Sequence, residues 1–271
     1  MSHDSFSQFL RPPSVTDDKY SRGVVGFVTG SEKYPGSAVL GVSAALATAI
    51  GMVRFLGSDR AADLVLNRHP ELVTAAGRCD SWVFGSGFEP ADFILAMDNW
   101  LPAEHTDEAQ VIDAGALLAF DFSQPAKYRV LTPHAGELST LLHRFEFSAT
   151  RDFVEANPAL CATEAARLTS SIVLLKGSTT WLADPAGKTR SVGPNSAHLA
   201  SAGSGDVLAG LIGALLAQNL KRDAEFEIFD LLELSINLHS RAGHLAAQSG
   251  PVSAMLVAEN IRGAILERWL A

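Results

Sequence analysis

Cysteine is scarce in this sequence, and so are clusters of basic residues and long apolar runs. The two cysteines, Cys79 and Cys161, are too few for a disulfide framework and lack the paired spacing of a zinc site. The formal net charge of −9, without a dense group of lysines and arginines, argues against nucleic acid or an anionic membrane as a partner. We therefore expect anionic ligands to be held locally, by backbone amides, helix N-termini and single cations.

The sequence also lacks the features of a secretion signal and of a membrane span. The residues before Tyr20 are polar and partly acidic, without the basic-then-apolar order of a signal peptide. The longest uncharged stretch, residues 37–53, is rich in Gly, Ala and Ser and falls short of the roughly 20 strongly apolar residues that a membrane helix needs. We expect a cytoplasmic protein in a reducing compartment.

Short β-branched runs alternate with longer runs rich in alanine and leucine, which indicates an α/β fold with a mostly parallel sheet. We expect strands at residues 23–30, 52–56, 81–84, 110–113, 128–131 and 171–175. The turn sequence Asp184-Pro185-Ala186-Gly187 predicts a hairpin over residues 179–192. We expect helices at residues 38–50, 138–142, 207–217, 231–247 and 253–270. Because no linker or repeat interrupts this order, we expect one domain over residues 1–271.

The stretch Gly203-Ser204-Gly205-Asp206, which we call the glycine bend, stands directly before an apolar helical run. Its glycines allow a tight turn with free N–H groups, and the helix start adds partial positive charge, so a phosphoryl group could bind there. Asp206 has two interpretations: the N-cap of the helix, or a carboxylate that takes a proton during phosphoryl transfer. In the second role, the helix N-terminus would stabilise its charge and lower its basicity.

The segment Lys176-Gly177-Ser178-Thr179-Thr180 follows a buried apolar run and is expected at the carboxyl end of a strand. Open α/β sheets bind ligands at that end, where a lysine can reach a phosphate as a point charge. The alternative is a lysine in a solvated turn. The defining motif of a P-loop enzyme is absent from the sequence, and Gly85-Ser86-Gly87 is a weak signal for a phosphate loop.

A third segment, Thr132-Pro133-His134-Ala135-Gly136-Glu137, follows one expected strand and precedes an expected helix. It is either a proline turn with Glu137 in the first helical turn, or a place where His134 contacts a ligand and Glu137 holds Mg²⁺ through water. Asp113 is expected at the same edge of the sheet, where it is either a turn residue or part of the site.

Together these segments resemble the NAD(P)H-hydrate dehydratase family, a branch of the ribokinase-like superfamily. The similarity runs in order from about residue 19 to residue 218. The matching segments are Lys19-Tyr20-Ser21-Arg22-Gly23, Tyr34-Pro35-Gly36-Ser37-Ala38, Asp113-Ala114-Gly115-Ala116-Leu117, Thr132-Pro133-His134-Ala135-Gly136-Glu137, Leu175-Lys176-Gly177 and Gly203-Ser204-Gly205-Asp206-Val207-Leu208. Two stretches, residues 85–89 and 195–200, differ from the sequences usual in the family.

The resemblance implies a single ribokinase-like domain, a three-layer sandwich with a mostly parallel central sheet and helices on both faces. It implies that the catalytic group is the glycine bend: Gly203, Ser204, Gly205 and Asp206. The nucleotide contacts that it implies are Lys176, Gly177, Ser178, Thr179, Thr180 and Gly205. The substrate contacts that it implies are Ala38, Gly85, Gly87, His134 and Asp206.

The activity implied by the resemblance is dehydration of the S epimer of hydrated NADH or NADPH, with ADP or ATP as phosphoryl donor and Mg²⁺ as cofactor. Asp206 would receive the hydroxyl proton while the amides of Ser204, Gly205 and Asp206 stabilise the moving phosphoryl group. The implied assembly is a homo-oligomer, for which a tetramer is one arrangement. Two alternatives stay open: a ribokinase-like kinase for a vitamin precursor, and a nucleotide-binding regulatory protein without catalysis.

Overall fold

One eight-stranded sheet forms the centre of the computed structural model, which describes residues 7–100, 108–124, 126–222 and 226–270. The strands lie in the order β2-β1-β3-β4-β5-β6-β7-β8. The parallel strands are β1 (Val24–Val28), β2 (Met52–Phe55), β3 (Ser81–Phe84), β4 (Ala109–Ile112), β5 (Arg129–Leu131) and β6 (Ile172–Leu175). The predicted hairpin is present as β7 (Thr180–Ala183) and β8 (Thr189–Val192), which extend the sheet in antiparallel pairing.

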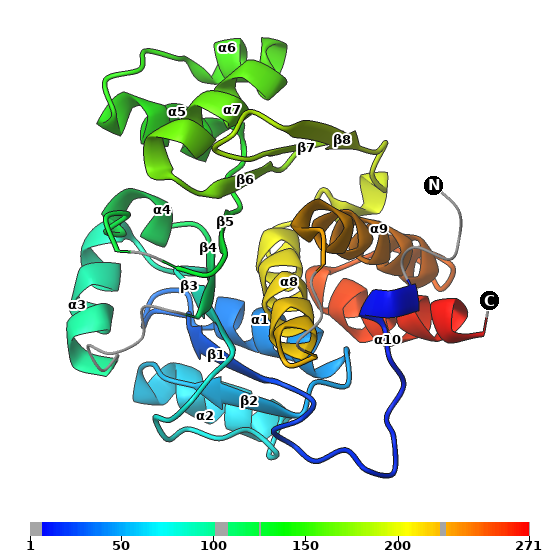
Figure 1. Ribbon diagram of the computed structural model, residues 1–271. Coiled ribbons are helices and arrows are strands. Elements are labelled where there is room, and N and C mark those ends of the chain that lie inside the picture. The colour runs from blue at the N-terminus through cyan, green and yellow to red at the C-terminus, as the bar shows by residue number, and fades with distance from the viewer. Residues whose placement is uncertain (1–6, 101–107, 125, 223–225, 271) are drawn as a thin grey trace.

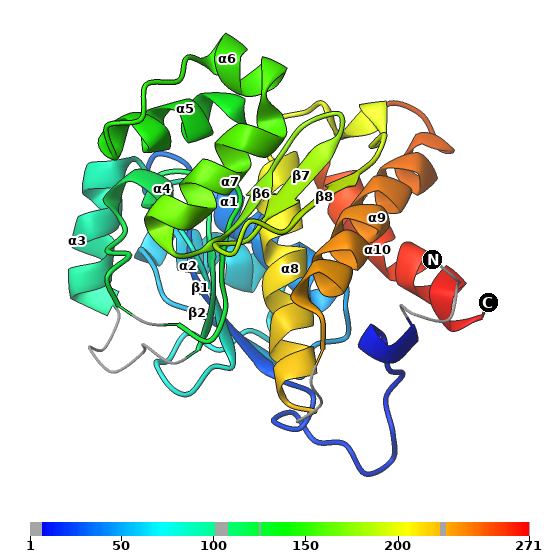
Figure 2. The same cartoon turned by 45° about the horizontal axis from the view of Figure 1, so that its top comes forward.

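Helices cover both faces of this sheet (Figures 1 and 2). One face carries α1 (Gly36–Leu46), α2 (Asp59–Arg68), α8 (Ser204–Leu220), α9 (Ile228–Ala247) and α10 (Ala254–Trp269). The other carries α3 (Pro90–Trp100), α4 (Ala116–Ala119), α5 (Ala135–Arg144), α6 (Arg151–Ala156) and α7 (Pro158–Thr169). The predicted three-layer α/β sandwich is therefore confirmed. Among the described helices, none combines the length and the apolar character needed to cross a membrane.

The strands are apolar on both sides because each side faces a layer of helices. Along β1, Val25 and Phe27 join the core beneath α1 and α8, whereas Val24 and Val28 join the core on the opposite face. This alternation follows from the two-residue repeat of a strand, and burial on both faces is typical of parallel sheets. It explains why the strand sequences are continuous apolar runs.

Helix α8 is the central helix of its layer and starts earlier than the sequence indicates. The expected helix covered residues 207–217, but the first turn already includes Ser204 and Asp206. The helix backbone touches that of α1: a Cβ atom at Gly210 would stand 2.1 Å from the carbonyl oxygen of Gly41. This close approach brings the beginning of α8 next to the beginning of α1, at the carboxyl edge of the sheet.

Replacing Gly210 by alanine should destabilise the protein, because neither backbone can move away without disturbing a packed layer. We expect a loss of about 1–3 kcal/mol in the free energy of unfolding, measured with urea. Gly36→Ala at the first residue of α1 is the matched control, since a Cβ there would meet no atom within 4 Å. Equal stability of both variants would contradict the helix contact.

Candidate active site

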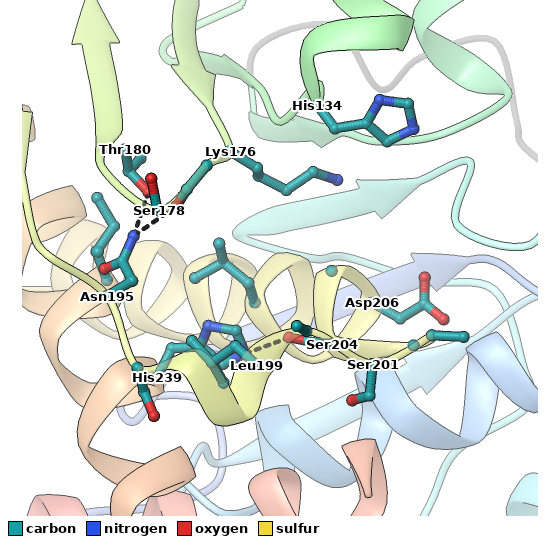
Figure 3. Close-up of a pocket in the computed structure, with 18 of the residues that line it drawn as sticks. His134, Lys176, Ser178, Thr180, Asn195, Leu199, Ser201, Ser204, Asp206 and His239 are labelled. Atoms are coloured by element: carbon teal, nitrogen blue, oxygen red, sulfur yellow. Dashed lines mark hydrogen bonds between the residues drawn. The ribbon is translucent and has the colours of Figure 1, made fainter. Parts of the chain in front are cut away.

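The carboxyl ends of β4, β5 and β6 open onto a cavity of about 800 Å³, which is also lined by α8, α9 and the segment before α8 (Figure 3). Parallel strands end at a common edge, so segments far apart in the sequence meet there. The predicted site residues in its wall are His134, Glu137, Lys176, Gly177, Ser178, Thr180, Gly203, Ser204, Gly205 and Asp206. The structure therefore brings the three predicted segments together in one cavity.

The glycine bend leads directly into α8. Gly203 is the N-cap, and its φ of 90° lies in the left-handed region that favours glycine. Asp206 is the third residue of the helix, so its interpretation as the N-cap is wrong. The Ser204 N–H donates to the Ser201 carbonyl at 3.3 Å, and its expected contact with a phosphoryl group stays a prediction. The N–H groups of the next two residues, Gly205 and Asp206, are orphans of the first helical turn and suit an anion.

A buried ion pair joins Lys176 to Asp113. The ammonium nitrogen of Lys176 donates to Oδ1 of Asp113 at 2.8 Å, and the carboxylate also accepts from the hydroxyls of Ser86 and Thr132, each at 2.8 Å. The Asp113 side chain is 2% exposed. The same ammonium lies 3.1 Å from the point where a Cβ at Gly205 would stand. The solvated-turn interpretation of Lys176 is therefore wrong, since its side chain is only 20% exposed and its ammonium is paired with Asp113 at the glycine bend.

Both partners of this pair stay ionised. Burial would raise the pKa of Asp113, but the charge of Lys176, with hydrogen bonds from Lys176, Ser86 and Thr132, holds it below its ordinary value. Burial would lower the pKa of Lys176, but the carboxylates of Asp113 and Glu137 outweigh that effect and raise it. We conclude that Asp113 is an anion and Lys176 a cation at neutral pH.

Asp206 differs from Asp113 because its pKa is raised, to about 6. Burial is the main cause and the negative charge of Asp113 the next, whereas a hydrogen bond from Ser37 and the charge of Lys176 act in the opposite direction. The lowered basicity expected from the helix N-terminus is therefore wrong. Desolvation outweighs the stabilisation that the helix dipole supplies.

His134 and Glu137 form a capping box at the start of α5. Nδ1 of His134 accepts from the Glu137 N–H at 3.1 Å, and Oε2 of Glu137 accepts from the His134 N–H at 2.8 Å. The same Oε2 lies 3.9 Å from the Lys176 ammonium. The helix-start interpretation of this segment is thus confirmed. It leaves Oε1 of Glu137 for other partners, while Nε2 of His134 lies 3.6 Å from Oε2 of Glu137.

Four predicted residues lie outside the wall of this cavity: Thr179, Ala38, Gly85 and Gly87. Thr179 lines a neighbouring hollow of about 590 Å³. Ala38 is fully buried in α1. A Cβ at Gly85 would stand 2.2 Å from the Asp113 carbonyl oxygen, and one at Gly87 would stand 2.7 Å from Ser37. Gly87 thus adjoins the serine that contacts Asp206. The expected substrate contacts of these residues stay predictions.

Several other residues in the cavity wall had no role predicted from the sequence. The side-chain amide of Asn195 donates to the Gly177 carbonyl and to the Thr180 hydroxyl, both at 2.9 Å, and so holds the hairpin to the segment before α8. His239 is 5% exposed and reaches the cavity from α9. The sequence contained a signal that His239 is buried, because it lies on the same helix face as the apolar residues of α9, three residues from Ile236 and four from Gly243.

Comparison with known sequences assigns this site to a family. Residues 25–263 match the sequence model of NAD(P)H-hydrate dehydratase. The chain belongs to the NAD(P)H-hydrate dehydratase family. The match covers all three predicted segments, which meet at the cavity of this chain described above.

Two curated relatives of the NAD(P)H-hydrate dehydratase family differ in how much of their length is matched. The bifunctional NAD(P)H-hydrate repair enzyme Nnr of Mycobacterium leprae is 39% identical, and the match covers 93% of this chain and 53% of the relative. The chain thus spans about half the length of that relative. The ADP-dependent (S)-NAD(P)H-hydrate dehydratase of Neisseria meningitidis serogroup B is 31% identical, with 98% of this chain and 90% of the relative covered.

Solved structures confirm the ribokinase-like fold. A crystal structure of the ADP/ATP-dependent NAD(P)H-hydrate dehydratase from Bacillus subtilis, co-crystallised with ATP and Mg²⁺, has a TM-score of 0.80 at 21% identity and covers 99% of this chain and 96% of that chain. A ribokinase-like superfamily protein from Enterococcus faecalis has a TM-score of 0.75 at 18% identity and covers 99% of this chain and 95% of that chain. At these identities, the likeness establishes the fold alone.

Breaking the buried ion pair should destabilise the protein. Asp113→Asn would leave the charge of Lys176 without its main partner, and we expect the free energy of unfolding to fall by about 3 kcal/mol. The double variant Asp113→Asn/Lys176→Met removes both charges and should lose less than the sum of the single variants. Urea unfolding of the three variants measures this coupling. Additive losses would show that the two side chains do not interact.

Proposed function

We propose that the protein dehydrates the S epimer of hydrated NADH or NADPH and restores the reduced nucleotide, with ADP or ATP as the phosphoryl donor. The observation that carries the proposal is the convergence of three groups on one cavity: the N–H groups of the glycine bend, the Asp206 carboxylate and the Lys176 ammonium. Family membership supports this assignment, as does the Neisseria relative, whose name gives this activity and of which the chain covers 90%.

Phosphoryl transfer solves the chemical difficulty of the reaction, because hydroxide is a poor leaving group. The hydroxyl oxygen of the hydrate attacks the terminal phosphorus of the donor, the bond from phosphorus to the bridging oxygen breaks, and the hydroxyl proton passes to Asp206. Phosphate then leaves with the help of the ring nitrogen, and loss of a neighbouring proton restores the double bond. The products are the reduced nucleotide, phosphate and either AMP from ADP or ADP from ATP.

The residues of the cavity divide this work. The N–H groups of Gly205 and Asp206 stabilise the phosphoryl group while it moves, since they are fixed before the reaction begins. Lys176 supplies a positive charge at the same bend. The segment from Lys176 to Thr180, fixed by Asn195, contacts the donor nucleotide. The substrate lies on the side of the cavity where His134 is, and the expected contacts with Ala38, Gly85 and Gly87 remain part of this proposal.

Glu137 is the residue that fits Mg²⁺. Mg²⁺ usually keeps several waters and binds proteins through one or two carboxylates together with donor phosphates, and Glu137 supplies a carboxylate in the cavity wall. Oε2 of Glu137 is engaged by the His134 N–H, which leaves Oε1 for such a contact. The ion would neutralise part of the negative charge of the donor.

We also propose a single catalytic domain, a cytoplasmic location and a homo-oligomeric assembly, for which a tetramer is one arrangement. The cytoplasmic location agrees with the thiols of Cys79 and Cys161, which are free and buried. Light scattering after size-exclusion chromatography measures the assembly.

The proposed activity is tested by incubating the purified protein with hydrated NADPH, Mg²⁺ and either ADP or ATP. Absorbance of the dihydronicotinamide should return, and phosphate should be released in equal amount. Asp206→Asn should abolish turnover while nucleotide still binds, because the amide cannot accept the proton. A folded wild-type protein without recovery under either donor would reject the dehydratase assignment. Accumulation of a phosphorylated product in place of phosphate would instead indicate a small-molecule kinase.

The pH dependence of turnover should report the ionisation of Asp206. Its pKa lies at about 6 and the carboxylate must be ionised to accept a proton, so kcat/KM should decrease as the pH falls below about 6. Because the charge of Asp113 contributes to the raised pKa of Asp206, Asp113→Asn should move the decrease of kcat/KM to lower pH. Asp184→Asn in the turn of the hairpin is the control and should not change the pH at which kcat/KM decreases. A profile that is flat down to pH 4.5 would contradict the role of Asp206.

A further inference from the structure

His239 connects helix α9 to the glycine bend. Its Nε2 lies 3.4 Å from the hydroxyl oxygen of Ser204, and Figure 3 shows this contact in the wall of the cavity. Both side chains are almost fully buried, with 5% exposure for His239 and 6% for Ser204. Nothing in the reaction described above uses this histidine. A buried polar side chain on an apolar helix stripe nevertheless needs a partner, and here that partner belongs to the glycine bend.

Ser204 is placed so that its orientation affects the two N–H groups that follow it. It comes directly after Gly203, whose left-handed backbone turns the chain into α8. Its N–H donates to the Ser201 carbonyl and its hydroxyl contacts His239, so both backbone and side chain are fixed. The next N–H groups are those of Gly205 and Asp206. A rotation of Ser204 would therefore turn these groups away from the phosphoryl position.

His239 is a neutral ring at the pH of the reaction. Burial, followed by the positive charge of Lys176, lowers its pKa to about 4, although a hydrogen bond to the Ser204 backbone acts in the opposite direction. A neutral imidazole offers a directed hydrogen bond and no charge to attract phosphate. Its contribution to the site is consequently geometric.

We propose that His239 is a positioning residue, which holds the Ser204 hydroxyl through Nε2 and thereby aims the N–H groups of Gly205 and Asp206 at the phosphoryl group in transfer. The proposal rests on the proposed function of the same site. It adds a second helix, α9, to the structure that prepares the glycine bend for catalysis, since preorganised donors stabilise a transition state without reorganising during the reaction.

The experiment replaces His239 by residues that keep or remove a polar atom at the position of Nε2. His239→Phe keeps the ring volume and removes the hydrogen bond. We expect kcat to fall about tenfold, with little change in the KM of the donor. Loss of a direct oxyanion donor lowers kcat by roughly 10²–10³-fold, and loss of a positioning residue should lower it less. His239→Gln can place an amide near Nε2 and should retain most of the activity. His239→Asn, whose amide reaches the position of Nδ1, should resemble His239→Phe.

Ser204→Ala provides the second half of the test. If His239 acts through the Ser204 hydroxyl, the double variant Ser204→Ala/His239→Phe should be no slower than the slower single variant. Multiplied losses would overturn the proposal. Equal activity of His239→Gln and His239→Asn would also overturn it. The same holds if His239→Phe raises the KM of the donor and leaves kcat unchanged. His143→Phe replaces an exposed histidine of α5 and serves as control, and circular dichroism checks that every variant folds.

A binding measurement separates this proposal from the proposed function. Wild-type protein that restores no reduced nucleotide would reject the dehydratase assignment, whatever the variants do. Orthovanadate with AMP and Mg²⁺ probes the glycine bend without the hydrate. His239→Phe and His239→Asn should weaken orthovanadate binding by about tenfold, and His239→Gln should not. Equal affinity of wild type and His239→Phe would overturn the positioning role.

Discussion

The ion pair between Asp113 and Lys176 joins the carboxyl ends of four neighbouring strands. Asp113 follows β4 and accepts hydrogen bonds from Ser86 after β3, Thr132 after β5 and Lys176 after β6. A buried carboxylate would be costly on its own, and the charge of Lys176 with hydrogen bonds to both carboxylate oxygens offsets that cost. Moving any one strand end would break part of this network. The pair therefore sets the floor of the cavity and the distance from Lys176 to the glycine bend.

The same pair affects the chemistry of Asp206 from a distance. A carboxylate at a helix N-terminus would ordinarily be a weak base, which would make proton acceptance difficult. Burial and the unchanging negative charge of Asp113 act against the helix and bring the pKa of Asp206 to about 6. A proton acceptor is most effective when its pKa lies near the working pH. In the proposed reaction, Asp113 thus raises the pKa of the proton acceptor without reaching the reacting atoms.

Strand sequences and the glycine bend were predictable because they depend on local signals. Apolar runs marked the strands, and Gly203 to Asp206 marked a helix start with free N–H groups. The partnership of Asp113 with Lys176 was not predictable from local sequence, because the two lie 63 residues apart and meet through the order of β4, β5 and β6. Likewise, the balance of burial against the helix dipole at Asp206 depends on packing. The spacing along α9 marks His239 as a buried polar residue, but its contact with Ser204, 35 residues away, depends on how α9 packs against α8.

The charges around the cavity explain why so much of the site consists of oriented dipoles. Lys176 is surrounded by the carboxylates of Asp113, Glu137 and Asp206, so its positive charge is already compensated before a nucleotide arrives. Simple attraction by lysine therefore cannot account for binding a phosphate chain to a protein with a net charge of −9. In the proposed function, the remaining attraction comes from the N–H groups at the start of α8, which act at short range and only when aimed correctly. In the proposed site, the residues that fix the glycine bend matter as much as those that touch the phosphate. Gly203, Ser204 and helix α9, which contacts Ser204 through His239, are therefore important for the proposed function.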